Sequence, residues 1–137
     1  MILIDTNVLS QPLRLNGSRR VNDWITANFD EIGIPVLAIS ELVYGIELIE
    51  DFDRRIQLTN AMAMMRLRFD DRFVPFDTAA AEAHGWLQAR MKRSGGRLPE
   101  IDSQIAAIAI SRNARIATRN TKDFERTGVE LIDPWTA

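Results

Sequence analysis

The chain opens with Met1-Ile2-Leu3-Ile4-Asp5-Thr6-Asn7, a short apolar run that meets three polar residues. An apolar run of this length predicts a buried strand, and the polar residues after it predict a turn into a helix. Short apolar runs alternate with helical stretches along the rest of the chain. This alternation favours an α/β domain in three layers, with a mostly parallel sheet between two layers of helices.

Hydrophobic periodicity predicts the bounds of most elements. Ser40 is expected to cap the helix that carries Glu41. Asp77 or Thr78 is expected to cap a helix that ends before the glycine pair at 95–96. The expected strands are residues 2–4, 33–38, 72–76, 115–118 and 129–132, and the expected helices are residues 21–29, 40–49, 54–69, 78–92, 101–112 and 120–125.

Length and composition narrow the choice of function. The 137 residues suit one domain, so residues 1–137 are expected to form a single unit. Cysteine is absent, which excludes disulfides, thiolate metal sites and a cysteine nucleophile and agrees with a reducing cytosol. His84 is the only histidine, so a cage of several histidines and a histidine pair for cleaving RNA are excluded. The net charge of −2 argues against a protein that coats DNA, and the lack of a visible targeting or membrane segment favours the cytoplasm.

Four acidic residues stand at corresponding places in the predicted topology. Asp5 follows the first strand and Glu41 follows the second. Asp102 begins an almost wholly apolar helix, and Asp123 follows the fourth strand. In a parallel sheet these points lie at one edge, so the four carboxylates are predicted to meet in a cleft. Each one alone could instead cap a helix or complement its dipole, but four matching places together favour a functional cluster.

Clustered carboxylates favour a bound cation. Two carboxylates about 5 Å apart repel each other by roughly 3 kcal/mol at an effective dielectric of about 20. Such a cluster either raises its pKa values or binds a cation. Without cysteine and with one histidine, the chain offers hard oxygen ligands, which suit Mg²⁺ or Mn²⁺ rather than Zn²⁺. Magnesium held by carboxylates typically acts on phosphate esters.

Four segments surround these acids: MILIDTNVLS (1–10), ISELVYGI (39–46), IDSQIAA (101–107) and TRNTKDF (118–124). They are followed by Pro134-Trp135 near the end of the sequence. These segments resemble the motifs of PIN-domain ribonucleases, and Pro134-Trp135 resembles a common ending. Within that family the set is similar to the VapC/FitB-like toxins of bacterial toxin–antitoxin pairs. The ordered set, which spans nearly the whole chain, is more specific than any one motif.

The resemblance implies roles for the residues that match these motifs. Asp5 and Asp102 match the principal Mg²⁺ ligands of the family, for which Mn²⁺ can substitute. Glu41 matches a third acid, which supports the attacking water or a second metal ion. The fourth acidic position is less regular: Asp123 or Asn120 could fill it, and Asp123 is favoured with Asn120 in support. The hydroxyls expected to orient the acids are those of Thr6, Ser40 and Thr118.

The same resemblance implies an activity and a set of partners. The activity is that of a Mg²⁺-dependent endoribonuclease and toxin, which hydrolyses an RNA phosphodiester with activated water and leaves a 5′-phosphate. Family members cut structured or loop RNA, often tRNA. The implied partners are a cognate antitoxin that covers the cleft, a second copy of the chain in a homodimer, and operator DNA bound through the antitoxin in higher-order complexes.

Arginines are candidates to lead RNA to the acidic cleft, since only two of the 17 basic residues are lysines. Arg93 and Arg97 flank a glycine-rich turn before Asp102 and are predicted to grip the RNA backbone, although a solvated turn explains them equally well. The other candidates to rim the cleft are Arg14, Arg19, Arg20, Arg90 and Arg119.

Some apolar side chains are candidates for contact with a partner protein, although burial in the core explains many of them equally well. Three methionines could form an adaptable surface, with burial in the core as the favoured alternative. His84 lies on an apolar helix and is expected to be structural. The apolar candidates are Leu9, Leu13, Leu15, Leu42, Ile46 and Ile49, and the methionines are Met62, Met64 and Met65.

Three other functions fit the sequence less well. An aspartate-nucleophile phosphatase also begins with an apolar strand that ends in Asp, but it needs a second Asp two positions after Asp5, where this chain has Asn7. A receiver domain needs paired early acids and a late lysine beside the site. A non-catalytic RNA-binding or regulatory PIN module would gain nothing from acids clustered on a phosphate-binding surface.

Overall fold

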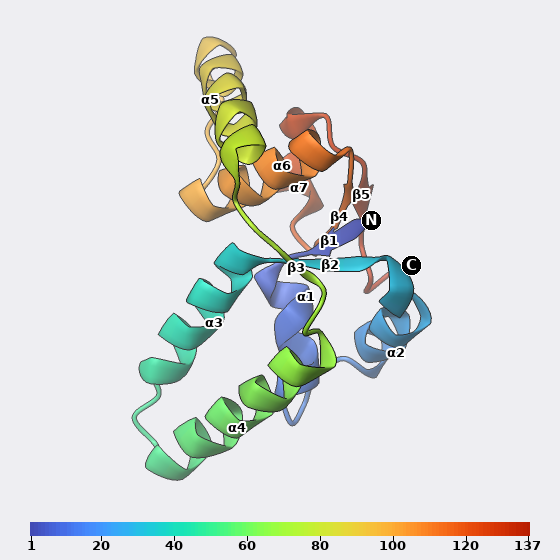
Figure 1. Ribbon diagram of the computed structural model, residues 1–137, viewed down its shortest axis with the longest axis vertical. Helices are drawn as coiled ribbons and strands as arrows, with labels where there is room; N and C mark the ends of the chain where they lie inside the picture. The colour runs from blue at the N-terminus through green and yellow to red at the C-terminus, as the bar shows by residue number, and fades with distance from the viewer.

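Five short strands form one parallel sheet in the computed structural model, which describes all residues 1–137 (Figure 1). The strands are β1 (Ile2–Ile4), β2 (Ile32–Pro35), β3 (Phe73–Val74), β4 (Arg115–Ala117) and β5 (Leu131–Ile132). Their order across the sheet is β3-β2-β1-β4-β5, and every neighbouring pair is parallel. The predicted α/β architecture with a parallel sheet is therefore confirmed.

The central strand β1 is buried on both faces. Leu3 pairs with Gly33 of β2 and with Ile116 of β4. Because side chains alternate along a strand, Ile2 and Ile4 join the core on one face of the sheet and Leu3 joins the core on the other. At Gly33, a Cβ atom would lie 2.9 Å from Cγ2 of Val74, so the strand passes its neighbour too closely for a larger residue.

Seven α-helices and three short 3₁₀-helices connect the strands. Asp5, Ser18, Asp51 and Asp77 each accept a hydrogen bond from a backbone N–H three residues later, which caps the helix that follows. No helix is both long and apolar enough to cross a bilayer. The helices are α1 (Thr6–Ser10), α2 (Arg19–Ala27), α3 (Val36–Glu47), α4 (Phe52–Arg68), α5 (Thr78–Arg93), α6 (Glu100–Arg112) and α7 (Thr121–Phe124), with η1 (Gln11–Leu13), η2 (Phe29–Glu31) and η3 (Glu125–Thr127).

The helices form a layer on each face of the sheet. Figure 1 shows α5 and α6 on one side of the strands and α1 and α2 on the other. The core on the α2 side includes Ile25 as well as Met62 and Met65 of α4, so two of the three methionines belong to the core as favoured, while Met64 is 67% exposed. The core on the α5 and α6 side includes Leu87 and Ile105.

The start of α3 differs from the prediction. The strand expected at 33–38 ends at Pro35, and the helix begins at Val36 rather than at Ser40. Ser40 therefore lies exposed within the helix and caps nothing, which corrects its expected capping role, and its side chain makes no hydrogen bond to an acid. The physical reason is that an apolar run such as 36–38 fits a strand or a buried helix equally well, and Pro35 can precede a helix because its missing N–H is not needed there.

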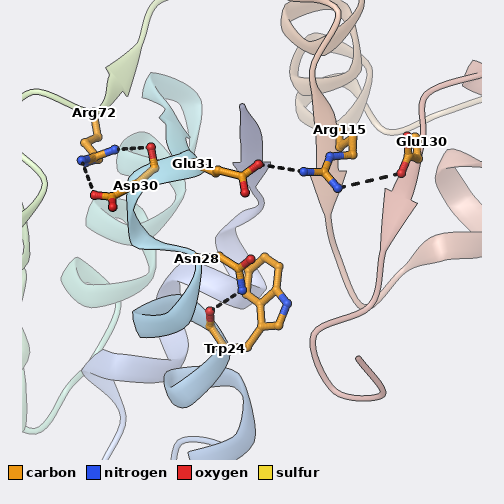
Figure 2. Close-up of polar contacts among 7 residues, drawn as sticks. All are labelled: Trp24, Asn28, Asp30, Glu31, Arg72, Arg115 and Glu130. Carbon is orange, nitrogen blue, oxygen red and sulfur yellow. Dashed lines mark hydrogen bonds and ion pairs between the residues drawn. The ribbon is translucent and has the colours of Figure 1, made fainter.

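Ion pairs lie at the amino ends of the strands (Figure 2). Arg115 at the start of β4 forms ion pairs with Glu31 at 2.9 Å and with Glu130 at 4.0 Å. Arg72 pairs with Asp30 at 3.6 Å, and its guanidinium lies over the ring of Phe29. Both arginines at this edge are therefore paired with acidic residues.

Candidate active site

The carboxyl ends of β1 and β4 form the point where the chain changes direction across the sheet. From β1 the chain proceeds outward to β2 and β3, and it later returns to the other side of β1 with β4 and β5. Ligands of open parallel sheets bind in the crevice at such a point. Asp5 directly follows β1 and Thr118 directly follows β4, so both side chains stand at this crevice.

Asp5 is held by hydrogen bonds to both of its oxygens. Its Oδ2 accepts a hydrogen bond of 2.6 Å from Oγ1 of Thr118, and its Oδ1 accepts one of 3.0 Å from the backbone N–H of Val8. Burial raises the pKa of Asp5 above its usual value, the bonds from Thr118 and Val8 partly oppose this rise, and the charge of Glu41 adds to it. Asp5 is thus both the cap of α1 and a member of an acidic cluster.

Glu41 is oriented from the first helix of the chain. Oγ1 of Thr6 donates a hydrogen bond of 2.6 Å to Oε1 of Glu41. Thr6 directly follows Asp5. This hydrogen bond therefore joins Glu41 to the segment that carries Asp5, although the two acids are far apart in the sequence. The expected orienting role of the Thr6 and Thr118 hydroxyls therefore agrees with the contacts that the two side chains make.

Asp102 is in electrostatic contact with the other three acids. It lies in the first turn of α6, half-buried. Burial is the largest cause that raises its pKa to about 6, followed by the charges of Asp5, Glu41 and Asp123. Four acids from four separate segments thus influence one another at the carboxyl edge of the sheet.

The fourth acidic position has two candidates, Asp123 and Asn120, which differ in charge and in contacts. Asp123 is exposed in the first turn of α7, and its charge raises the pKa of Asp102. Asn120 donates its backbone N–H to Oγ1 of Thr118 at 3.0 Å, while its side chain makes no capping hydrogen bond. Asn120 therefore contacts the threonine that holds Asp5, while Asp123 adds negative charge near Asp102, and the preference for Asp123 at the fourth position stays a prediction.

None of the four acids forms an ion pair. The six ion pairs of the structure join other residues, most of them at the amino edge of the sheet or on exposed helix faces. The negative charge of the cluster is therefore not compensated by any lysine or arginine. A structural network would pair these carboxylates, whereas a site for a cation leaves them free.

Comparison with known proteins agrees with this arrangement. The family model described as the PIN domain matches residues 2–130. The chain belongs to the PIN-domain family, among its VapC/FitB-like toxin ribonucleases. This PIN domain is 33% identical, over 137 residues and 98% of both chains, to VapC ribonuclease Y4jK of Sinorhizobium fredii.

Solved structures share its fold over their whole length. FitAcB from Neisseria gonorrhoeae matches with a TM-score of 0.91 and 29% identity, and the match covers 100% of both chains. The DNA-bound VapBC of Salmonella typhimurium matches with a TM-score of 0.82 and 25% identity, over 97% of both chains. The PIN fold predicted from the motifs is therefore confirmed.

PIN nucleases are typically metal-dependent, and the acids of this PIN domain suit a hard divalent cation. As the side chains lie, no three acidic or histidine side chains are placed to hold one ion. The donor set nevertheless consists of carboxylate oxygens, the ligands that Mg²⁺ and Mn²⁺ prefer. The raised pKa of Asp102 reflects negative charge that a cation would neutralise.

A groove of about 900 Å³ lies between α1, η1, α3 and α4, and Glu41 is the one acid of the cluster that lines it. Its lining is mixed, with apolar side chains beside polar and charged ones such as Asn7, Arg14 and Gln57. Leu9 is fully buried in the core, so it is not available to a partner, and its expected contact is corrected. The other five apolar candidates line the groove: Leu13, Leu15, Leu42, Ile46 and Ile49.

The candidate arginines differ in how far they are engaged. Arg19 pairs with Asp23 at 3.9 Å, and Arg20 donates to backbone carbonyls at the end of the chain. Arg90 lies over the ring of Trp86. The candidates that form no ion pair with an acid and lie exposed are Arg14, Arg20, Arg90, Arg93, Arg97 and Arg119.

Two features of the site region go beyond what the sequence predicts. Sequence patterns give Arg126 no role, yet a Cβ at Gly96 would lie 2.5 Å from its Nη1, so its guanidinium rests on the turn between Arg93 and Arg97. No local sequence pattern indicates this contact, because the two segments meet only through tertiary packing. For His84 the sequence predicts only a structural role; its Nε2 lies 2.9 Å from Oγ of Ser103, which ties α5 to the first turn of α6.

Proposed function

We propose that this VapC-family ribonuclease toxin is a Mg²⁺-dependent endoribonuclease built as one domain over residues 1–137. The observation that carries the proposal is the electrostatic cluster around Asp102, whose pKa of about 6 arises from burial and from three carboxylates on other segments. A protein that only bound RNA would be repelled by this cluster. A nuclease needs it, because carboxylates are the ligands for the cation that offsets phosphate charge.

Each acid has a proposed role. Asp5 and Asp102 would hold Mg²⁺ with Glu41, and Mn²⁺ is expected to substitute. When bound, the ion would neutralise charge on the phosphate and lower the pKa of a water molecule. Asp123 completes the negative cluster, with Asn120 in support.

The chain's own residues would orient the reaction. Thr118 fixes Asp5 and Thr6 fixes Glu41, each through one hydroxyl hydrogen bond of 2.6 Å. Glu41 keeps Oε2 free of protein donors, so it is the carboxylate proposed to accept a proton from the attacking water. Water adds to the phosphorus, the bond to the 3′-oxygen breaks, and that oxygen leaves with a proton, so the products are a 5′-phosphate and a 3′-hydroxyl.

The test of this function is cleavage of bulk tRNA, the proposed substrate class, by the purified protein. We expect cleavage with Mg²⁺ or Mn²⁺, 5′-phosphate ends on the fragments, and no cleavage in EDTA. Undiminished cleavage in EDTA would refute the metal-dependent mechanism. Binding of tRNA without cleavage under every metal condition would favour the alternative of a non-catalytic RNA-binding or regulatory PIN module.

The proposed partner is a cognate antitoxin that inhibits the toxin in the cytoplasm, where RNA substrates lie. Among the similar structures, VapBC of Salmonella typhimurium is bound to DNA. For this chain we propose a homodimer that joins the antitoxin in a larger complex, with operator DNA contacted through the antitoxin. The groove that reaches Glu41 supports inhibition by a segment of the antitoxin that lies in the groove and covers the acids.

Gly45→Gln is predicted to weaken binding of the antitoxin by about tenfold or more. Gly45 lines the groove and a Cβ there would meet nothing within 4 Å, so a glutamine side chain would occupy space needed by the antitoxin. Calorimetric titration with the antitoxin encoded beside the toxin measures the effect.

Gly85→Gln is the matched control, because Gly85 also lies in a helix with open space at its Cβ but does not line the groove. Both variants are expected to gain about 0.5–1 kcal/mol of stability, since glycine is a poor helix former. Equal antitoxin affinity for the two variants would place the antitoxin elsewhere on the surface.

Joint substitution of Arg93 and Arg97 by alanine is predicted to weaken RNA binding and flatten its salt dependence. Removal of one phosphate contact lowers the slope of log affinity against log salt by about 0.7 for single-stranded RNA. Fluorescence anisotropy with labelled RNA over a series of KCl concentrations measures the slope. Arg66→Ala, which removes one exposed charge from the end of α4, is the control. Binding that is unchanged relative to this control would contradict the role of the two arginines.

A further inference from the structure

Arg119 is an uncompensated positive charge beside the acidic cluster. It follows Thr118, whose hydroxyl is 2.6 Å from Oδ2 of Asp5. It is exposed, and none of the six ion pairs of the structure includes it. An arginine at this place is therefore free to pair with an anion that enters the cleft.

The guanidinium of Arg119 lies over the indole ring of Trp135. The guanidinium carbon of Arg119 lies 5.2 Å from the centroid of the Trp135 ring. A cation over an aromatic face is attracted by the ring, and stacking uses the flat face of the guanidinium. Its N–H groups, which lie in the plane, stay available to donate to a phosphate.

The position of Trp135 is fixed by packing and by hydrogen bonds. The ring packs against the core on the α2 side of the sheet, and its backbone N–H donates to Oδ1 of Asp133 at 2.9 Å. The backbone oxygen of Asp133 accepts from the N–H groups of Thr136 and Ala137. Arg20 of α2 donates to the carbonyl oxygens of the same two residues at 3.1 and 3.0 Å. The turn at 133–137 is thus held in place by hydrogen bonds and supports the ring of Trp135.

From this arrangement we infer that Arg119 binds a backbone phosphate of the RNA next to the cleavage site, and that Trp135 is a positioning residue which acts through Arg119. The inference rests on the proposed ribonuclease function and names the path of its substrate. Trp135 belongs to the α2 layer, whereas Arg93, Arg97 and Asp102 belong to the α5 and α6 layer. The RNA backbone would therefore cross the edge of the sheet from one layer to the other, over the acids.

The test measures binding of a short fluorescein-labelled single-stranded RNA of mixed sequence by anisotropy over a series of KCl concentrations. All proteins carry Asp102→Asn and are kept in EDTA, so that the RNA stays intact. Arg119→Ala is expected to weaken binding about tenfold and to lower the salt slope by about 0.7, the value for one phosphate contact. Arg119→Lys should keep the slope, because the charge remains, but bind more weakly, because the planar donor pair is lost.

The Trp135 variants separate a positioning role from a direct contact. Trp135→Phe keeps a ring and should retain most of the binding, while Trp135→Leu should approach the effect of Arg119→Ala. In the Arg119→Ala background, Trp135→Leu should cause no further loss. If Trp135→Leu fails to fold, Arg20→Ala tests the same support: it should weaken binding only when Arg119 is present.

Two results would overturn the inference. The first is an affinity and salt slope for Arg119→Ala equal to those of Arg66→Ala, an exposed control on α4. The second is a further loss on removing the indole or Arg20 when Arg119 is already absent, which would mean that these side chains contact RNA themselves. Neither result bears on metal-dependent cleavage by the unmodified protein, so failure of this inference is distinguishable from failure of the proposed function.

Discussion

Asp102→Asn is expected to reduce Mg²⁺-dependent RNA cleavage by about a thousandfold, the scale on which loss of one preorganised electrostatic group acts. The same substitution is expected to raise the melting temperature of the metal-free protein. Asp102 is a half-buried charge whose pKa is raised to about 6 by burial and by Asp5, Glu41 and Asp123, so its ionised form destabilises the fold. After allowance for solvent screening the gain is about 1 kcal/mol, or about 3 °C.

The pH dependence of this gain follows from the sign of the pKa shift. In the unfolded chain Asp102 ionises near its ordinary pKa of 3.8, and in the folded chain it ionises near 6. At low pH, Asp102 is protonated in both the folded and the unfolded chain, so it does not destabilise the fold. As the pH rises from about 4 to about 6, this destabilisation grows. The difference in melting temperature between Asp102→Asn and the parent should be near zero below about pH 3 and largest above about pH 6. Thermal melts in EDTA at several pH values measure it.

Glu100→Gln is the matched control for Asp102→Asn. Glu100 lies in the same first turn of α6 but is exposed, so it shares the favourable position near the helix N-terminus without the burial. The control should keep its cleavage activity and lose at most about 0.3–1 kcal/mol of stability. A large fall in melting temperature for Asp102→Asn would show that Asp102 acts as a structural residue of α6 instead.

Elements with an abrupt change from apolar to polar residues could be predicted from the sequence. Asp5 follows an apolar strand at once, so its place at the end of β1 was predictable. The start of α3 could not be predicted, because the apolar residues 36–38 fit a strand and a buried helix equally well. The cap rule then favoured Ser40, a typical capping residue that in the structure lies inside the helix.

Contacts between distant segments are the part of the site that local patterns cannot predict. The bond from Thr118 to Asp5 joins residues 113 positions apart, and the stacking of Arg119 on Trp135 depends on how the end of the chain packs against the sheet. The choice between Asn120 and Asp123 likewise depends on tertiary packing, which places the charge of Asp123 near enough to Asp102 to raise its pKa. The types of residue in the site could be predicted, because few side chains can bind a divalent cation. The contacts between these residues could not be predicted, because they depend on tertiary packing.

Thr118→Val is expected to lower Mg²⁺-dependent cleavage by about 10- to 100-fold, the usual cost of losing a group that orients a metal ligand. Thr118 is fully buried; its Oγ1 donates to Asp5 at 2.6 Å and accepts from the backbone N–H of Asn120 at 3.0 Å. Valine has nearly the same shape but leaves a buried carboxylate oxygen and a backbone N–H without their partner, at a cost of about 1–3 kcal/mol. The pKa of Asp5 should rise further, because the bond from Thr118 now lowers it. The pH at which cleavage begins should therefore move upward, which a pH–rate profile measures.

Thr127→Val separates this effect from a general loss of stability. Thr127 is equally buried, and its hydroxyl donates to the carbonyl of Phe124 at 2.6 Å and accepts from the N–H of Val129 at 3.3 Å. It thus makes the same kind of bonds as Thr118 but touches no carboxylate. At a temperature well below both melting points, Thr127→Val should retain parental activity and an unshifted pH profile, and Thr118→Ser, which restores the hydroxyl, should recover most of the rate. If Thr118→Val and Thr127→Val lost activity equally, the hydroxyl of Thr118 would serve folding alone and Asp5 would not depend on it for its function.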